Sequence, residues 1–175
     1  MKKIVAVILT VFLLLNIASC GKNSFGGPEK SYGNFVVVLD ADESKAKNAM
    51  AIEWHWDGNP ENMVISVPDY FPDGIKVTSV GGATGSSLGG DTRIPFTVVI
   101  DEAKAEEQSS DTIVFTVEIG KNVQSIYFKS SANPYLFYFV CDDSNPVLYS
   151  KDGKVYSKET NKLYSGIPSG CYGDI

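Results

Sequence analysis

The chain has 175 residues with a formal net charge of −6 at pH 7, and 43% of its residues are hydrophobic. This length favours one domain with one hydrophobic core. The negative charge and the lack of a basic stripe disfavour binding to the phosphate backbone of nucleic acids.

The first residues of the chain have the pattern of an export signal. Lys2 and Lys3 precede an uncharged apolar run from residue 4 to residue 15. This order of charge and apolar run is typical of a secretory signal peptide. As a helix the run would span about 18 Å, which is short of the ~30 Å hydrocarbon core, so a permanent membrane span is disfavoured.

The signal ends in Ile17-Ala18-Ser19-Cys20-Gly21, which resembles the bacterial lipobox. The resemblance implies that residues 1–19 are removed and that Cys20 carries diacylglycerol, which gives a protein anchored on the extracytoplasmic side, at the outer membrane or cell surface. A lipid with two or more chains anchors a protein stably, whereas one chain binds marginally. Ordinary secretion with a chance cysteine at the cleavage site is the alternative.

The mature chain divides into a tether and one domain. Residues 20–34 are rich in Gly, Ser, Asn and Pro without an apolar period, which predicts a lipidated flexible tether. Residues 35–175 are predicted to form a single domain.

The domain is predicted to be mostly β. Over residues 112–119 apolar and polar side chains alternate, which is typical of a half-buried strand. An Asp-Gly pair at 152–153 predicts a C-terminal hairpin. A short helix is expected over 42–50, and a charged helical turn or loop over 101–110. Further strands are expected at 35–39, 51–56, 64–67, 74–81, 92–100, 137–141, 147–150, 154–157 and 162–164.

Parts of the sequence are similar to each other. The pattern Val-x-Ser-[Val/Ile] occurs at Val77 and again at Val123, an offset of 123 − 77 = 46 residues, or twice 23. Val117 and Phe139 are separated by a further step of 139 − 117 = 22 residues. Both steps fit the leucine-rich-repeat period, which makes a short solenoid plausible.

These segments resemble the BspA-type (treponemal) leucine-rich repeats of bacterial surface proteins. The most specific match is residues 139–158, similar to the family's terminal Val-Asp-x-x-Asn-Pro-x-Tyr-x-Ser-x-Asp-Gly-x-Leu-Tyr-x-Lys stretch. The family's Ala-Phe pair is missing after Val80-Gly81 and after Ile126. The resemblance implies a short leucine-rich-repeat-like solenoid with irregular capping strands, in a protein that serves as an adhesin or interaction module.

Two cysteines remain for the domain, Cys141 and Cys171. Alternation places Phe137, Phe139 and Cys141 on one face of a strand, which favours Cys141 as a core residue. A disulfide between Cys141 and Cys171 is the alternative.

No motif indicates catalysis. Residues 85–89 fit the Gly-x-Ser-x-Gly pattern of a hydrolase elbow, but no helical period follows, and the only histidine, His55, lies upstream. One histidine cannot form a zinc-ligand set. The acidic clusters at 40–43 and 142–145 do not have EF-hand spacing, so solvated turns are expected. We therefore expect no enzyme activity, cofactor or metal site.

Trp54 and Trp56 flank His55 and favour a packed aromatic strand, with a ligand-stacking site as the alternative. The sequence predicts a lipid-anchored protein that binds a protein partner. The alternatives are a structural or envelope-assembly lipoprotein, and a glycan-binding protein that uses Trp54 and Trp56.

Overall fold

The computed structural model describes residues 25–84, 92–100, 113–132 and 134–173. The predicted lipidation site Cys20, the glycine-rich motif at 85–89 and the charged segment at 101–110 lie outside these residues. The described part is mostly β, as predicted. Its helical elements are two 3-10 turns, η1 (Ser130–Ala132) and η2 (Ser169–Cys171).

The larger sheet combines an antiparallel and a parallel part. β1, β2 and β3 pair in an antiparallel manner, whereas β3 pairs parallel to both β5 and β8, and β5 pairs parallel to β10. The strands are β1 (Glu29–Tyr32), β2 (Phe35–Leu39), β3 (Asn48–Trp56), β5 (Lys76–Val80), β8 (Thr97–Ile100) and β10 (Ser125–Ile126).

The second sheet is parallel throughout and has the order β11-β9-β4. Two antiparallel pairs complete the described strands, β6 with β7 and β12 with β13. The bounds are β4 (Val64–Ser66), β6 (Gly82–Thr84), β7 (Thr92–Ile94), β9 (Val114–Ile119), β11 (Leu136–Cys141), β12 (Leu148–Lys151) and β13 (Lys154–Ser157).

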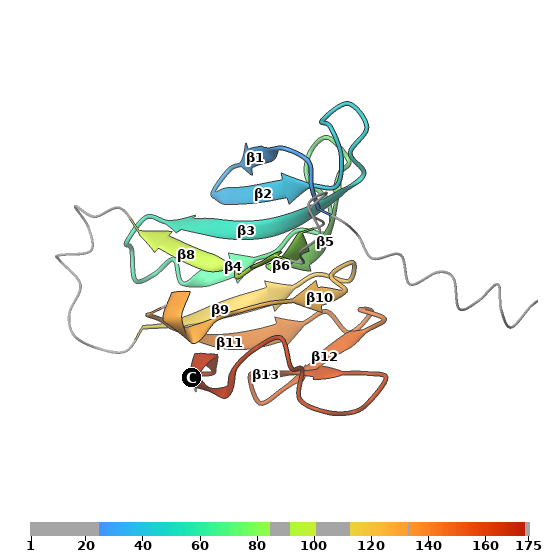
Figure 1. Ribbon diagram of the computed structural model, residues 1–175. Coiled ribbons are helices and arrows are strands. Elements are labelled where there is room, and N and C mark those ends of the chain that lie inside the picture. The colour runs from blue at the N-terminus through green and yellow to red at the C-terminus, as the bar shows by residue number, and fades with distance from the viewer. Residues whose placement is uncertain (1–24, 85–91, 101–112, 133, 174–175) are drawn as a thin grey trace, which may run out of the picture.

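The internal similarity of the sequence corresponds to strand pairing. Phe139 pairs with Val117, and Ser125 pairs with Ser79, so the register offsets are 22 and 46 residues. Figure 1 shows the strands stacked in layers, from β1 and β2 at one end to β12 and β13 at the other. Parallel stacking is shared by several β architectures, so the leucine-rich-repeat solenoid stays a proposal.

An aromatic layer of the core lies on the inward side of the β4-β9-β11 sheet. Alternation buries Phe115, Val117 and Ile119 on β9, as predicted, and also Phe137 and Phe139 on the neighbouring β11. Phe128, from the segment after β10, packs against this layer, with ring centroids 4.8 Å from Phe137 and 5.3 Å from Phe139. The layer joins segments that are far apart in the sequence.

The C-terminal hairpin is confirmed. Lys151 pairs with Lys154, and the two residues between them have positive φ, 50° at Asp152 and 70° at Gly153. Positive φ at both central positions defines the type I′ turn that Asp-Gly pairs favour.

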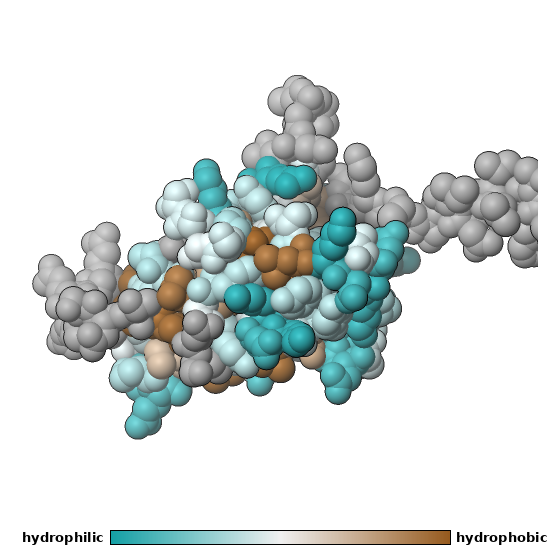
Figure 2. Space-filling model, turned by 90° about the horizontal axis from the view of Figure 1, so that it is seen from below, coloured by the Kyte–Doolittle hydropathy of each residue, from teal (hydrophilic) through white to brown (hydrophobic). Residues whose placement is uncertain are grey.

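Seen from the end where β12 and β13 lie, the surface shows small hydrophobic patches separated by hydrophilic residues (Figure 2).

The predicted tether at 20–34 is wrong for residues 25–34. Phe25 is only 3% exposed and packs in a cluster with Val38, Met50 and Ile52. Residues 29–32 form β1, which pairs with β2 through a two-residue turn at Gly33 and Asn34. Gly33 has a φ of 57° there, so the Gly-Asn pair is a hairpin signal that composition alone conceals. The domain therefore includes Phe25.

The short helix expected over 42–50 is also wrong. The Asp40 carboxylate accepts hydrogen bonds from the Lys47 N–H at 3.0 Å and from Asn48 Nδ2 at 2.7 Å, which closes the segment as a loop. From Asn48 onward the chain belongs to β3, and Asn48 pairs with Lys76. Pairing on both edges of β3 provides the backbone partners that a helix would otherwise supply.

The strand expected over 92–100 is two strands. β7 ends at Ile94 and β8 begins at Thr97, with Pro95 and Phe96 between them. The Phe96 side chain is fully buried, and its N–H donates to the Tyr127 carbonyl at 2.9 Å. Proline has no N–H to continue a ladder, so the chain changes partner here.

Among the described residues, no helix is long and apolar enough to cross a membrane.

Candidate functional site

The outward side of the β4-β9-β11 sheet is a mixed surface that we call the outer face. On β4, Val64 and Ser66 point outward while Ile65 is buried, and Val64 is 50% exposed. On β11, Val140 is 43% exposed between buried neighbours. The parallel register aligns the outward residues in two rows, which are Val64-Thr116-Tyr138 and Ser66-Glu118-Val140.

One hydrogen bond crosses the outer face between strands. Ser66 Oγ donates to Glu118 Oε2 at 2.5 Å, linking β4 to β9. This bond positions a carboxylate beside exposed Val140 in the same row. The outer face therefore offers aliphatic contact area and negative charge together.

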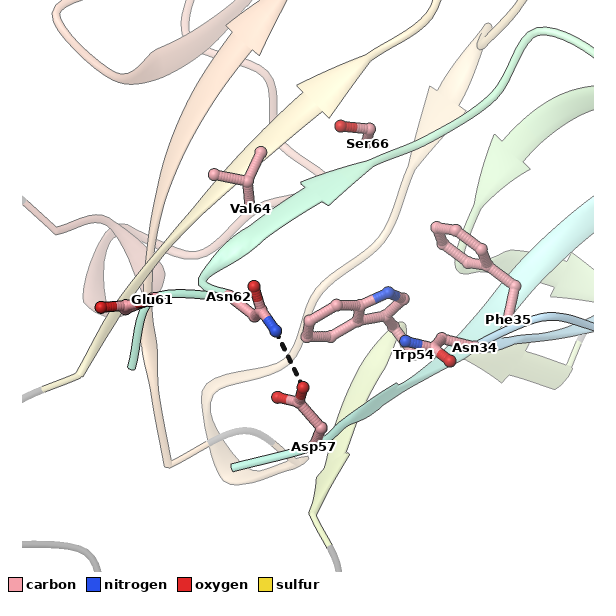
Figure 3. A pocket seen from close by; sticks show the side chains of 8 residues that line it. All are labelled: Asn34, Phe35, Trp54, Asp57, Glu61, Asn62, Val64 and Ser66. Carbon is pink, nitrogen blue, oxygen red and sulfur yellow. Dashed lines mark hydrogen bonds between the residues drawn. The ribbon is translucent and has the colours of Figure 1, made fainter. Parts of the chain in front are cut away.

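Two hollows adjoin the outer face. The β4-edge pocket, about 420 Å³, lies between β4 and the residues around the start of β2 and the end of β3 (Figure 3). It is lined by Asn34, Phe35, Trp54, Asp57, Glu61, Asn62, Val64 and Ser66. The strand-end pocket, about 340 Å³, lies at the carboxyl ends of the three strands and is lined by Ser66, Val67, Asp69, Glu118, Ile119, Gly120, Val140, Cys141 and Asp142.

Both pockets are acidic. Asp57 and Glu61 line the β4-edge pocket, and Asp69, Glu118 and Asp142 line the strand-end pocket, whereas neither lining contains Lys, Arg or His. A hydrogen bond from the Ser144 hydroxyl holds the pKa of Asp142 below its ordinary value, so this carboxylate is ionised at neutral pH. These linings favour cationic ligands.

One ion pair at the rim of the strand-end pocket reduces its charge. Lys121 Nζ lies 3.0 Å from Asp69 Oδ2, and the hydrogen bond to Asp69 raises the pKa of Lys121. Glu118 and Asp142 remain as further carboxylates in the same lining. A net negative charge is left there.

Trp54 and Trp56 form the packed aromatic strand that the sequence favoured. They are 7% and 3% exposed, and their rings lie 5.9 Å and 5.0 Å from the ring of Phe115. Trp56 Nε1 donates to the Asn59 carbonyl at 3.0 Å. A stacking platform that uses both tryptophans is therefore wrong, because Trp56 has no exposed ring face. His55, between them, is exposed and lies 3.3 Å from Glu53.

The two domain cysteines are free and buried, so the alternative of a disulfide is not realised. Cys141 is a core residue, as predicted, at 7% exposure. Burial raises the pKa of the Cys141 thiol to about 11 and also raises the pKa of Cys171. Both thiols are therefore protonated at neutral pH, which makes them poor nucleophiles.

The acidic clusters form turns in the described structure. Asp40 closes the loop before β3, and Asp142 accepts a hydrogen bond from the Ser144 N–H at 2.7 Å. Within the described ranges, no group of three or more His, Cys, Asp or Glu residues is placed to hold a metal ion.

Asn145 is the important residue that sequence reasoning did not single out. Its side chain is fully buried, and Nδ2 donates to the Gly120 carbonyl at 2.9 Å and to the Val123 carbonyl at 2.8 Å. Its Oδ1 accepts hydrogen bonds from the N–H groups of Val147 at 2.9 Å and Leu148 at 2.8 Å. One amide therefore joins the turn after β9 to the start of β12. The Asn-Pro pair of the closing motif is the available sequence signal.

Comparisons with known proteins do not assign the chain to a family. No family model and no curated protein matches the chain. Among solved structures, the crystal structure of the pneumococcal vaccine antigen PcpA matches at 9% identity with a TM-score of 0.20. The match covers 82% of this chain and 57% of that chain. A score of this size carries no argument about fold or function, so the outer face and its pockets carry the functional conclusion.

Proposed function

We propose that the protein is a lipid-anchored extracytoplasmic lipoprotein whose domain, a short leucine-rich-repeat-like solenoid, binds another protein through the outer face. The observation that carries the proposal is that the outer face combines two exposed aliphatic side chains, Val64 and Val140, with the carboxylates of the two adjoining pockets. Apolar contact area surrounded by a polar rim is the usual anatomy of a protein–protein interface.

The repeat interpretation is supported by the strand registers. Phe139 of β11 pairs with Val117 of β9 at an offset of 22 residues, which is one repeat length, whereas Ser125 of β10 pairs directly with Ser79 of β5 at 46 residues, which is two repeat lengths. In stacked repeats, each sheet buries one face against the core and presents the other as an extended surface. The outer face has this relation to the aromatic core.

Of the alternatives, glycan binding is supported by Trp54, whose ring lies in the β4-edge pocket beside Asn34 and Asn62 (Figure 3). With Trp54 only 7% exposed, the ring area left for stacking on a sugar is small. A protein partner uses the whole outer face and is therefore preferred.

The anchor is tested by labelling cells with palmitate. The wild-type chain is expected to incorporate the label, and Cys20→Ala is expected to abolish it, because the lipobox resemblance places the lipid on that sulfur. Cys171→Ala removes a buried cysteine and is expected to leave labelling unchanged. A wild-type chain without label would contradict the lipid anchor.

The interaction is tested by photo-crosslinking in intact cells. A photo-reactive amino acid in place of Val140 is expected to give a discrete covalent adduct with one protein. The control is the same substitution at Leu163, which is 44% exposed against 43% for Val140 but lies outside the outer face. Equal adducts from both positions, or none from Val140, would remove the support for the outer face. Protease shaving of the same cells separates an adhesin, which is cut, from an internal envelope component, which is spared.

A further inference from the structure

Among the described residues, β4 is paired along one edge, and no strand is paired with its other edge. The Thr116 N–H donates to the Met63 carbonyl at 2.9 Å, and the Val67 N–H donates to the Glu118 carbonyl at 3.0 Å. In a parallel pair, alternate residues of a strand face the partner. Met63, Ile65 and Val67 therefore face β9, and the N–H and C=O groups of Val64 and Ser66 point to the other side. In the described part of the chain, β4 is the last strand of its sheet on this side.

The opposite edge of the same sheet is covered. Along β11, the Phe139 N–H donates to the Gly153 carbonyl at 2.9 Å, and the Gly173 N–H donates to the Phe137 carbonyl at 3.0 Å. The C-terminal hairpin and the segment after it thus protect that edge. Proteins commonly protect sheet edges in this way, because an uncovered edge pairs with other chains.

The β4-edge pocket lies beside the edge of β4 that has no paired strand among the described residues. In Figure 3 the Trp54 ring lies between β4 and Asp57, and Phe35 lies farther along the same space. Phe35 and Trp54 are 9% and 7% exposed, so they form an apolar floor. Asp57 and Glu61 are the acidic residues of the pocket lining. Asn62 Nδ2 donates a hydrogen bond of 2.8 Å to the Asp57 carboxylate.

We propose that the β4-edge pocket binds an extended, cationic segment of a protein partner as a fourth strand of the β4-β9-β11 sheet. Backbone groups of the segment pair with Val64 and Ser66. Because side chains of a strand alternate between its two faces, alternate side chains of the segment cover the small exposed areas of Phe35 and Trp54, and a lysine or arginine side chain of the segment reaches Glu61. This inference rests on the proposed function and names the class of partner and its site.

The first test compares two substitutions at Ser66 in the full chain, purified in detergent. Ser66→Pro removes the N–H that faces the pocket and leaves the ladder to β9, which uses Ile65 and Val67, unchanged. Ser66→Ala keeps the N–H and removes only the hydroxyl that donates to Glu118. Seven-residue peptides are selected from a random displayed library on the wild-type chain, and their dissociation constants are measured on all three proteins.

The selected peptides are expected to alternate apolar residues with lysine or arginine. Ser66→Pro is expected to weaken them by about tenfold or more, because a desolvated hydrogen bond is lost, and Ser66→Ala by less than about twofold. Glu61→Lys is expected to weaken them severalfold and to reduce the dependence of binding on salt.

A second measurement does not depend on how Ser66→Pro folds. N-methylation of the peptide amides that face β4 is expected to abolish binding to the wild-type chain, whereas methylation of the intervening amides is tolerated. Equal effects of the two methylation patterns, equal affinity for Ser66→Pro and Ser66→Ala, or a failure to enrich any peptide would overturn the inference. If the adduct from position 140 still forms in cells, the proposed function stands and only the edge pairing fails; if no adduct forms, both fail.

Discussion

Replacing Asn145 by alanine is expected to lower the free energy of unfolding by about 3 to 4 kcal/mol. The side chain is fully buried and makes four hydrogen bonds, two through Nδ2 and two through Oδ1. Alanine leaves the carbonyls of Gly120 and Val123 and the N–H groups of Val147 and Leu148 without these partners. Unsatisfied buried groups make the loss larger than that of an exposed hydrogen bond.

Urea unfolding followed by circular dichroism measures this loss. Ser144→Ala, in the same turn, is the control, because Ser144 is exposed and its hydroxyl donates to neighbouring Asp142, so a change within about 0.5 kcal/mol is expected. Asn145→Asp keeps an acceptor but loses both donated hydrogen bonds and introduces a buried charge, so it is expected to destabilise as well. A loss below about 1 kcal/mol for the alanine variant would contradict the buried network.

Phe137→Ala is expected to lower the free energy of unfolding by about 3 to 5 kcal/mol. The Phe137 ring is fully buried, with ring centroids at 6.2 Å from Phe115, 4.8 Å from Phe128 and 6.2 Å from Phe139. Its removal opens a cavity between two parallel strands and the segment after β10. The cost combines lost burial with the cavity that remains.

The matched control is the next residue along β11. Tyr138 lies on the outer face and packs over Gly153, where an added Cβ would come within 2.3 Å of its ring. Tyr138→Ala is therefore expected to cost clearly less than Phe137→Ala, about 1 to 2 kcal/mol, in the same urea experiment. A larger loss at 138 than at 137 would show that the strand faces are assigned the wrong way round.

Local pattern was sufficient for much of the fold. Period-two alternation identified the buried face of β9 and of β11, because only one face of each strand packs on the core. The Asp152-Gly153 pair identified the hairpin, because type I′ turns require residues that tolerate positive φ. The step of 22 residues from Val117 to Phe139 also matches the parallel register of β9 and β11, whereas β5 and β10 pair directly at 46 residues, twice the predicted repeat period.

The failures came from partners that are distant in sequence. The tether prediction missed β1, because the Gly and Pro content of residues 20–34 concealed the hairpin signal of Gly33-Asn34. It also missed Phe25, because the apolar cluster that contains Phe25 and Met50 forms only in the folded domain. The polar residues after Asp40 allow a helix over 42–50 when the sequence is considered alone. In the structure, hydrogen bonds to the Asp40 carboxylate close this segment as a loop.

The candidate site could not be read from the sequence for the same reason. The β4-edge pocket combines Asn34 and Phe35 with Trp54 and with Val64 and Ser66, from three separate strands or turns. Their spacing in the sequence carries no periodic signal. Trp54 stood out as a residue type, but its role as a pocket floor depends on the burial of its ring.

The buried position of Phe25 limits how far the domain can reach from the bilayer. Five peptide units separate Cys20 from Phe25, and a fully extended chain of that length spans at most about 18 Å. With a lipid on Cys20, the domain is confined to a thin layer next to the membrane surface. A partner carried by the same membrane then meets it at a raised effective concentration, and a partner on another surface has to approach the bilayer closely.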